Sequence, residues 1–134
     1  MIKQYLKVKR ISEKGRGVFS QRKIPSGTLI EESHVIVLSA EDRKLIDKTL
    51  LHDYIFEWED PENDKKERRC CMALGLVPIY NHSYQSNCEY FMDFEEETMQ
   101  IKTVRDVEKF EELTINYNGD WNNEKEVWFE VEGN

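Results

Sequence analysis

The sequence is poor in cysteine. It has three cysteines, of which Cys70 and Cys71 are adjacent and Cys88 stands alone. This number and spacing do not build a disulfide framework, and they match no zinc site. We therefore expect buried free thiols, a reducing cytoplasmic setting and no bound metal.

Long apolar runs are also missing. The longest stretch without formal charge, 70–88, is interrupted by Gly75, Pro78 and a polar run that begins at Asn81. A membrane helix needs about 20 predominantly apolar residues, so we expect no membrane span. No apolar block of signal-peptide length follows the basic N-terminal residues, and we expect no leader. The 134 residues predict a single domain, 1–134.

Positive charge is scarce outside the N-terminal region. Residues 1–30 carry eight Lys and Arg against Glu13 alone, whereas the remaining residues carry eleven against 26 Asp and Glu. The net charge of −8 argues against general nucleic-acid binding. It favours a cationic partner such as a lysine-rich peptide, although acidic residues can also simply keep a protein soluble. Candidates for such an acidic surface are Asp93, Glu95, Glu96 and Glu97.

Most of the chain has the character of short strands separated by turn residues. Residues 3–11 alternate between polar and apolar side chains, as a half-buried strand does. An acidic turn between two apolar runs indicates a hairpin. Further strands are expected at Thr28–Glu32, Val35–Leu38, Tyr54–Trp58, Tyr90–Phe94, Met99–Val104 and Leu113–Tyr117. We predict a mostly β fold with little helix.

One helix is predicted, from Ser39 to about His52. Ser39 can accept a hydrogen bond at the helix start, and Asp42 three residues later resembles the acidic member of a capping box. The face of this helix carries Leu45, Ile46, Thr49 and Leu50.

Four short sequence motifs follow one another along the chain, and their order is informative. They are Gly15-Arg16-Gly17-Val18-Phe19, Met72-Ala73-Leu74-Gly75, Ile79-Tyr80-Asn81-His82-Ser83 through Asn87, and Glu112-Leu113-Thr114-Ile115-Asn116-Tyr117. Alone each is weak: the Gly-x-Gly is typical of a bend between strands, and the histidine of a structural residue. Together they resemble the SET-domain protein lysine methyltransferases, most closely the small stand-alone members of viruses and bacteria. The resemblance covers about 4–121, which leaves 122–134 as a tail.

The resemblance implies a β-clip-like fold of several small sheets with a C-terminal pseudo-knot. In it, the chain at Glu112–Tyr117 threads beneath the Asn81 segment, so that the two motifs pack around a channel. S-adenosylmethionine would bind on one face, and the substrate lysine would enter from the other. The implied cofactor-binding residues are Arg16 and Gly17 through their backbone, Asn81 through its side chain, and His82 through its backbone at the adenine edge.

The resemblance also makes Tyr117 the catalytic tyrosine, with Tyr80 and Tyr117 lining the lysine channel. The chemistry suits these residue types. Methyl transfer to nitrogen needs in-line alignment and a neutral amine. A lysine with a pKa near 10.4 costs about 4 kcal/mol to neutralise at pH ~7.4, and an aromatic channel lowers that cost by desolvation. Glycine permits close approach to a ligand, and asparagine offers both a donor and an acceptor.

Some residues depart from the family pattern. The run Ser83-Tyr84-Gln85-Ser86-Asn87 lacks the usual cysteine and proline, and Asn116 replaces an aspartate. No cysteine follows Cys88, so the zinc cluster of many eukaryotic members is absent. Another group must then close the channel. The candidates are Trp121, which we favour, Trp128 and Phe129; the alternative is that these aromatic residues anchor the C-terminus.

The sequence thus predicts an S-adenosylmethionine-dependent protein-lysine N-methyltransferase that acts on a basic protein segment, such as a histone-like tail. A non-catalytic module that holds a basic partner through its acidic surface is the alternative, and methylation of a small amine also stays open. We expect no direct nucleic-acid partner, and a homodimer is compatible with the exposed tail aromatics. We expect a cytoplasmic protein, or a nuclear one (including a host nucleus) if histones are its substrate.

Overall fold

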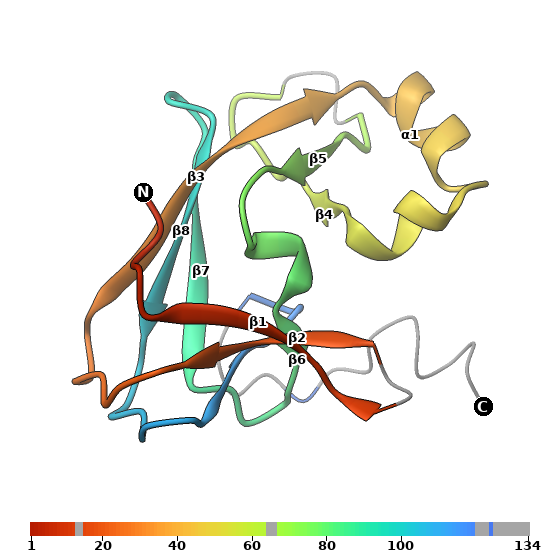
Figure 1. Cartoon of the computed structure of the whole chain (residues 1–134). Helices are drawn as coiled ribbons and strands as arrows, with labels where there is room; N and C mark the ends of the chain where they lie inside the picture. The colour runs from red at the N-terminus through yellow and green to blue at the C-terminus, as the bar shows by residue number, and fades with distance from the viewer. Residues whose placement is uncertain (13–14, 64–66, 120–123, 125–134) are drawn as a thin grey trace.

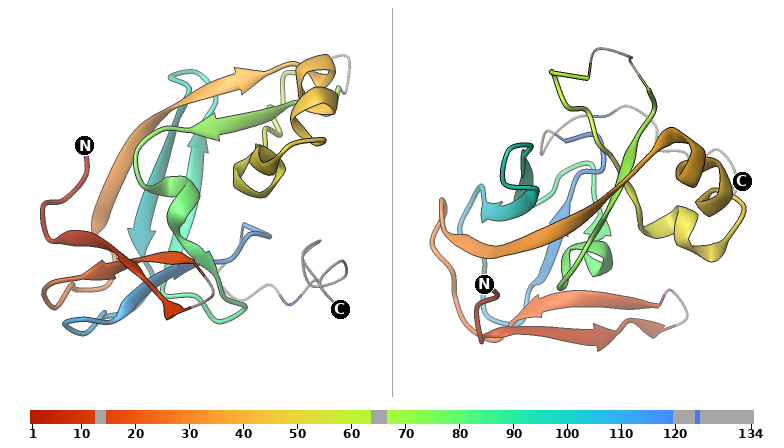
Figure 2. Two further views of the ribbon diagram at one scale, coloured as in Figure 1. Left: turned by 45° about the vertical axis from the view of Figure 1, so that its right-hand side comes forward. Right: turned by 90° about the horizontal axis from the view of Figure 1, so that it is seen from above.

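The structure, a computed structural model, describes residues 1–12, 15–63, 67–119 and 124 (Figure 1). It is mostly β, as predicted, with two small sheets packed against each other (Figure 2). One sheet has the order β1-β2-β9-β6 and comprises Leu6–Arg10, Arg16–Ser20, Glu112–Ile115 and Asn81–His82. The other has the order β4-β5-β3-β8-β7 and comprises Phe56–Glu57, Cys70–Ala73, Leu29–Leu38, Thr98–Thr103 and Cys88–Asp93.

The four-stranded sheet brings the two long-separated motifs side by side. β9 pairs antiparallel with β2 on one edge and parallel with β6 on the other. In the parallel pair Asn81 lies opposite Thr114, and His82 lies opposite Ile115. Asn87 then ties the following loop to β9, because its side chain donates to the Glu112 carbonyl and accepts from the Thr114 N–H. This pairing is the contact that the expected pseudo-knot requires.

The five-stranded sheet confirms the predicted hairpin and joins two predicted strands. β7 and β8 pair antiparallel along their length, from Cys88 opposite Thr103 to Asp93 opposite Thr98. β3 runs unbroken through Ser33 and His34, where the sequence suggested a gap. The first half of β3 pairs with β8 and the second half with β5, so the partner changes while the strand continues.

The predicted helix is shorter than expected. α1 covers Ala40–Ile46, and Ser39 caps it as predicted by accepting a hydrogen bond from the Asp42 N–H at 3.1 Å. The chain then starts the 3-10 turn η2 (Leu50–Tyr54), because the Thr49 hydroxyl accepts from the Leu51 N–H and offers an alternative to the helix. Leu45 and Leu50 stay exposed, so the expected apolar face is not buried.

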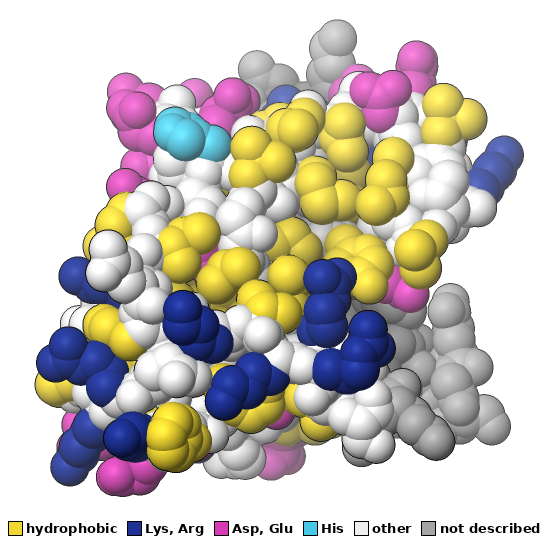
Figure 3. All heavy atoms as spheres, in the orientation of Figure 1, with side chains coloured by type: hydrophobic (Ala, Val, Ile, Leu, Met, Phe, Trp, Pro, Cys, Tyr) yellow, Lys and Arg dark blue, Asp and Glu magenta, His cyan; other side chains and the backbone are white. Residues whose placement is uncertain are grey.

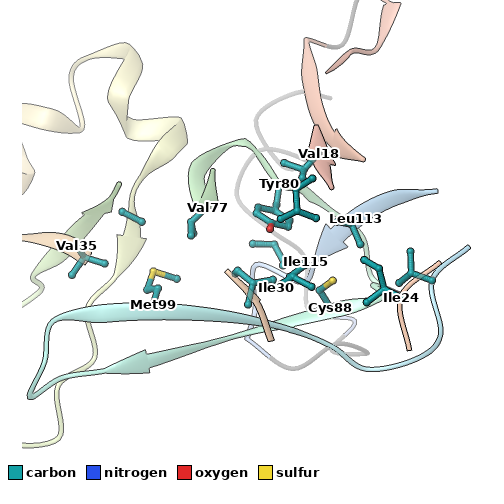
Figure 4. Close-up of a cluster of buried hydrophobic side chains, with 14 of the residues drawn as sticks. Val18, Ile24, Ile30, Val35, Val77, Tyr80, Cys88, Met99, Leu113 and Ile115 are labelled. Carbon is teal, nitrogen blue, oxygen red and sulfur yellow. The ribbon is translucent and has the colours of Figure 1, made fainter. Parts of the chain in front are cut away.

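A continuous core joins the two sheets (Figure 4). Val18, Leu113 and Ile115 come from the four-stranded sheet, whereas Ile30 and Met99 come from the five-stranded one. Between them lies the segment after β5, with the 3-10 turn η3 (Val77–Ile79). This arrangement fixes the end of η3, where β6 and its asparagine begin.

All three cysteines are free and buried, which confirms the expected thiols. Burial raises the pKa of Cys71 to about 12 and raises the pKa of Cys88 further still. No helix in the described part of the chain is long and apolar enough to cross a membrane.

Candidate functional site

A cleft of about 660 Å³ lies where β6, β9 and η2 meet the N-terminal hairpin, which is formed by the antiparallel strands β1 and β2. This volume is within the range of roughly 300–1,000 Å³ that small-molecule sites occupy. Its lining comprises Ile11, Gly15, Arg16, Asp53, Tyr54, Pro78, Ile79, Asn81, His82, Glu112 and Tyr117. Four of the site residues predicted from the sequence are thus gathered in one cleft, although they come from three separate parts of the chain.

Asn81 connects three of these segments. Its side-chain nitrogen donates to the Arg16 carbonyl at 3.0 Å and to Glu112 Oε2 at 2.7 Å. The first bond holds the start of β2, and the second holds the start of β9. The sequence placed Asn81 and Arg16 at one end of a cofactor, and the structure places them in direct contact.

Gly17 is required by close packing. A Cβ at this position would lie 2.5 Å from Glu112 Oε2 and 2.6 Å from Ile11 Cδ1, both closer than real Cβ contacts. It would also lie 3.0 Å from the side-chain nitrogen of Asn81. The glycine therefore lets β2 approach the Asn81–Glu112 pair, and any side chain here would push that pair out of place.

Tyr117 follows β9 and is held at both its hydroxyl and its backbone. The hydroxyl donates to the Tyr80 carbonyl at 2.9 Å, and the backbone N–H donates to Nδ1 of His82 at 3.0 Å. Burial raises the pKa of the Tyr117 hydroxyl to about 12, and the nearby Asp53 and Glu112 carboxylates act in the same direction. The hydroxyl therefore stays protonated, as a hydrogen-bond donor, throughout the neutral range.

Tyr80 reaches the site through its backbone. Its side chain is 1% exposed and lies in the core near Val18 and Leu113 (Figure 4). Burial, followed by the nearby Glu31 carboxylate, raises the pKa of its hydroxyl well above the usual range. The sequence assigned Tyr80 to the lysine channel; what the structure presents to Tyr117 is the Tyr80 carbonyl, and the ring points into the core.

Several aromatic residues of the site were missed by the sequence analysis. Phe56 packs edge-on against Tyr117 with ring centres 6.1 Å apart, and against Tyr90 at 5.3 Å. The Tyr90 hydroxyl donates to the Tyr117 carbonyl at 3.3 Å. Tyr54 of η2 lines the cleft itself. The high aromatic content of 54–58 was the available signal, but no local pattern shows that this segment reaches β9.

The remaining candidates lie elsewhere. Trp121, together with Trp128 and Phe129, lies outside the described residues. Asp93 and Glu95 line a separate groove beside the β7–β8 hairpin, with Asp60 and Glu62. In the described part of the chain no group of three or more His, Cys, Asp or Glu side chains could hold a metal ion.

Comparison with known proteins places this geometry in a family. A model of the SET domain matches residues 15–118. Over 133 residues the chain is 32% identical to the Schizosaccharomyces pombe protein named histone-lysine N-methyltransferase, H3 lysine-37 specific, covering 98% of this chain and 82% of that one. A crystal structure of a Plasmodium falciparum protein assigned as a histone methyltransferase has the same fold, with a TM-score of 0.65 and 23% identity, over 91% of this chain and 100% of that one. The chain belongs to the SET-domain family.

Proposed function

We propose that this protein is an S-adenosylmethionine-dependent protein-lysine N-methyltransferase that acts on a basic protein segment. The observation that carries the proposal is the protonated Tyr117 hydroxyl, held on the Tyr80 carbonyl in the same cleft as the Asn81 contacts. The Schizosaccharomyces pombe relative is named for a histone H3 lysine, so a histone tail is the first substrate to test.

The polar groups of the cleft fit such a cofactor. The Arg16 carbonyl and the carboxylates of Glu112 and Asp53 are acceptors that suit an ammonium group and a positively charged sulfonium. Pro78, Ile79 and Tyr54 supply the apolar and aromatic surface that a purine ring needs. Arg16, Gly17 and Asn81 would hold the amino-acid end, and His82 the adenine edge, as the family resemblance assigns them. When bound, the cofactor supplies the methyl group and the positive charge of its sulfur.

The protein must favour the neutral form of the substrate lysine and align its nitrogen with the methyl group. Transfer of the methyl group would form a C–N bond to the lysine and break the bond between the methyl carbon and the cofactor's sulfur, whose electron pair stays on the sulfur. The lysine nitrogen needs a lone pair to form that bond, so the ammonium group must first lose a proton to solvent. Phe56, Tyr90 and Tyr117 form an aromatic cluster, and we place the lysine on the side of it where Tyr117 lines the cleft. Such surroundings desolvate an ammonium group and lower its pKa. The Tyr117 hydroxyl and the Tyr80 carbonyl can then orient the amine, which accounts for much of the rate in a displacement of this kind.

Titration with S-adenosylhomocysteine by calorimetry tests the cofactor site without knowledge of the substrate. We expect wild-type protein to bind it, and Asn81→Ala to weaken binding at least about tenfold, because the ties to Arg16 and Glu112 are lost. Asn63→Ala is the matched control: it removes an asparagine outside the cleft, whose side chain donates to the Glu67 carbonyl at 2.9 Å on the surface. Circular dichroism should show that both variants fold like the wild type.

The result decides between enzyme and module. Binding that Asn81→Ala weakens and Asn63→Ala preserves supports the enzyme, and justifies a search for methylated lysines with labelled cofactor. No binding at millimolar ligand to wild-type protein would contradict the proposal and favour a non-catalytic module that retains the fold.

A further inference from the structure

The N-terminal hairpin carries a basic and aromatic surface for which the proposed reaction has no use. Lys7 of β1 lies opposite Phe19 of β2, and Lys9 lies opposite Gly17. Directly opposite residues and residues two apart in a strand share one side of the sheet, so both lysines and Phe19 are on the same side. Phe110 joins them from the turn before β9. We call this surface, Lys7, Lys9, Phe19, Lys109 and Phe110, the basic face.

The charges of the hairpin are not neutralised within the described part of the chain. There, every ion pair draws its cation from Arg43, His52, Arg68, Arg69 or Arg105, and none from residues 1–30. Lys and Arg side chains gather over the part of the molecule where β1 and β2 lie (Figure 3). The net charge of −8 therefore describes the whole chain and not this side of it.

Some carboxylates lie close to the basic face. Glu111 is paired with Arg105 at 3.6 Å, whereas Glu112, opposite Phe19, accepts from the neutral Asn81 amide and keeps its charge. Glu108, exposed next to Lys109, offsets one positive charge. The lysines still outnumber the available carboxylates on this face.

Phe110 combines an unfavourable backbone conformation with an exposed side chain. Its φ is +70°, in the left-handed region that is unfavourable for a bulky side chain, yet the residue is 57% exposed. The turn is fixed in this shape, since the Phe110 N–H donates to the Ser20 carbonyl at 2.7 Å. The ammonium groups of two exposed lysines lie over the ring, Lys9 at 5.5 Å and Lys109 at 4.9 Å from its centre. Strain that exposes an aromatic ring instead of burying it indicates a role other than stability.

We propose that the basic face binds single-stranded nucleic acid. Surfaces that bind single strands combine cations along the phosphate backbone with exposed rings on which bases stack. A base that stacks on Phe110 would displace an exposed lysine side chain from the ring, and Lys9 and Lys109 would then lie within reach of its phosphates. Lys7 continues the row along β1. An acidic peptide would use the lysines but would have no need of the exposed ring. A strand held here would lie beside Gly17, and so next to the Asn81 end of the cleft.

Fluorescence anisotropy with a labelled single-stranded oligonucleotide tests this proposal in the absence of cofactor and substrate. We expect binding at low salt, and a loss of at least about tenfold in Lys7→Glu/Lys9→Glu. The slope of log Kd against the logarithm of the salt concentration should fall by about 1.4, because two phosphate contacts are lost and each contributes roughly 0.7 on a single strand. Lys44→Glu/Lys48→Glu makes the same change in net charge on exposed residues in and just after α1, and should leave affinity within about twofold.

Phe110→Gly separates recognition from folding. Glycine adopts the observed φ without strain, so the unfolding temperature should not fall, whereas affinity for the single strand should drop several-fold. Equal losses in the two charge-reversal variants, duplex bound as tightly as the single strand, or competition by polyglutamate at equal charge would each overturn the proposal. Because no outcome depends on methyl transfer, its failure would leave the proposed enzyme untouched.

Discussion

At the scale of single residues, Tyr117 contacts both halves of the Tyr80–His82 segment. Its hydroxyl donates to the Tyr80 carbonyl, and its backbone N–H donates to the His82 ring. The sequence identified Tyr117, Asn81 and His82 through the family motifs, and the structure brings them together. It could not show that Tyr80 contributes a carbonyl, because which way a side chain points depends on the core around it and not on the motif.

We predict that Tyr117→Phe lowers the turnover number by about 100-fold or more, since one positioned hydrogen-bond donor in a transition state is worth about that much. The fold and the affinity for S-adenosylhomocysteine should stay close to wild type, because the ring and its contact with Phe56 are kept. Methylation of a histone peptide, followed by mass spectrometry, gives the turnover. Tyr5→Phe, which removes a hydroxyl outside the cleft, is the control and should be fully active. Full activity in Tyr117→Phe would exclude this hydroxyl from the mechanism.

At the scale of elements, the segment between β5 and β6 sets the position of Asn81. Glu31 of β3 is fully buried beneath it, and its Oε2 accepts from the Leu76 N–H at 2.8 Å and from the Ser33 hydroxyl at 2.7 Å. Gly75 makes room, since a Cβ there would lie 2.5 Å from the same carboxylate oxygen, and its φ of +79° favours glycine. One internal carboxylate thus anchors the turn that leads to the cleft.

We predict that Glu31→Ala destabilises the fold by about 2–3 kcal/mol, because it leaves a buried N–H and a hydroxyl without their acceptor. Glu31→Gln should cost less, since its amide oxygen can still accept. Urea unfolding measures both, and equal losses in the two variants would show that the acceptor is unimportant.

The pH dependence of Glu31→Gln gives a further test. Burial raises the pKa of Glu31 above its usual value of 4.5, so the folded chain holds this proton more tightly than the unfolded chain does. This contribution to stability is present below pH ~4.5 and is lost as the pH rises through the folded-state pKa. Glutamine lacks that titration, so the stability of the variant relative to wild type should improve between pH 4 and pH 7. A constant difference across this range would contradict the assignment.

Prediction of the elements succeeded where partners are close in sequence. The β7–β8 hairpin and the Ser39 cap depend on residues a few positions apart, and both were predicted. β5 was missed because a short apolar run alone does not distinguish a strand from other buried chain. The parallel pairing of β6 with β9 joins residues more than thirty positions apart, and only the family resemblance indicated it.

At the scale of the whole molecule, the core buries several weak acids. Burial raises the pKa values of Cys71 and Tyr117 to about 12 each, and it raises those of Cys88 and Tyr80 as well. The composition indicated buried thiols, but the size of such shifts depends on packing between two sheets. Because these thiols and hydroxyls ionise more easily in the unfolded chain, together they make the stability of the fold sensitive to alkali.

We predict that the free energy of unfolding falls steeply above pH ~9. Each of these groups keeps its proton in the folded chain and loses it in the unfolded chain, so stability is complete below the unfolded pKa and is lost as the pH rises toward the folded one. Each such group removes about 1.4 kcal/mol per pH unit in that window. Urea unfolding at pH 8, 9, 10 and 11 measures how steeply the free energy of unfolding falls with pH.

Cys71→Ala should reduce that slope by the contribution of one titrating group. It should also lower stability at pH 8, where the thiol is protonated in both the folded and the unfolded chain. An unchanged slope in this variant would mean that the Cys71 thiol already ionises within the fold, and that the junction between the two sheets admits water.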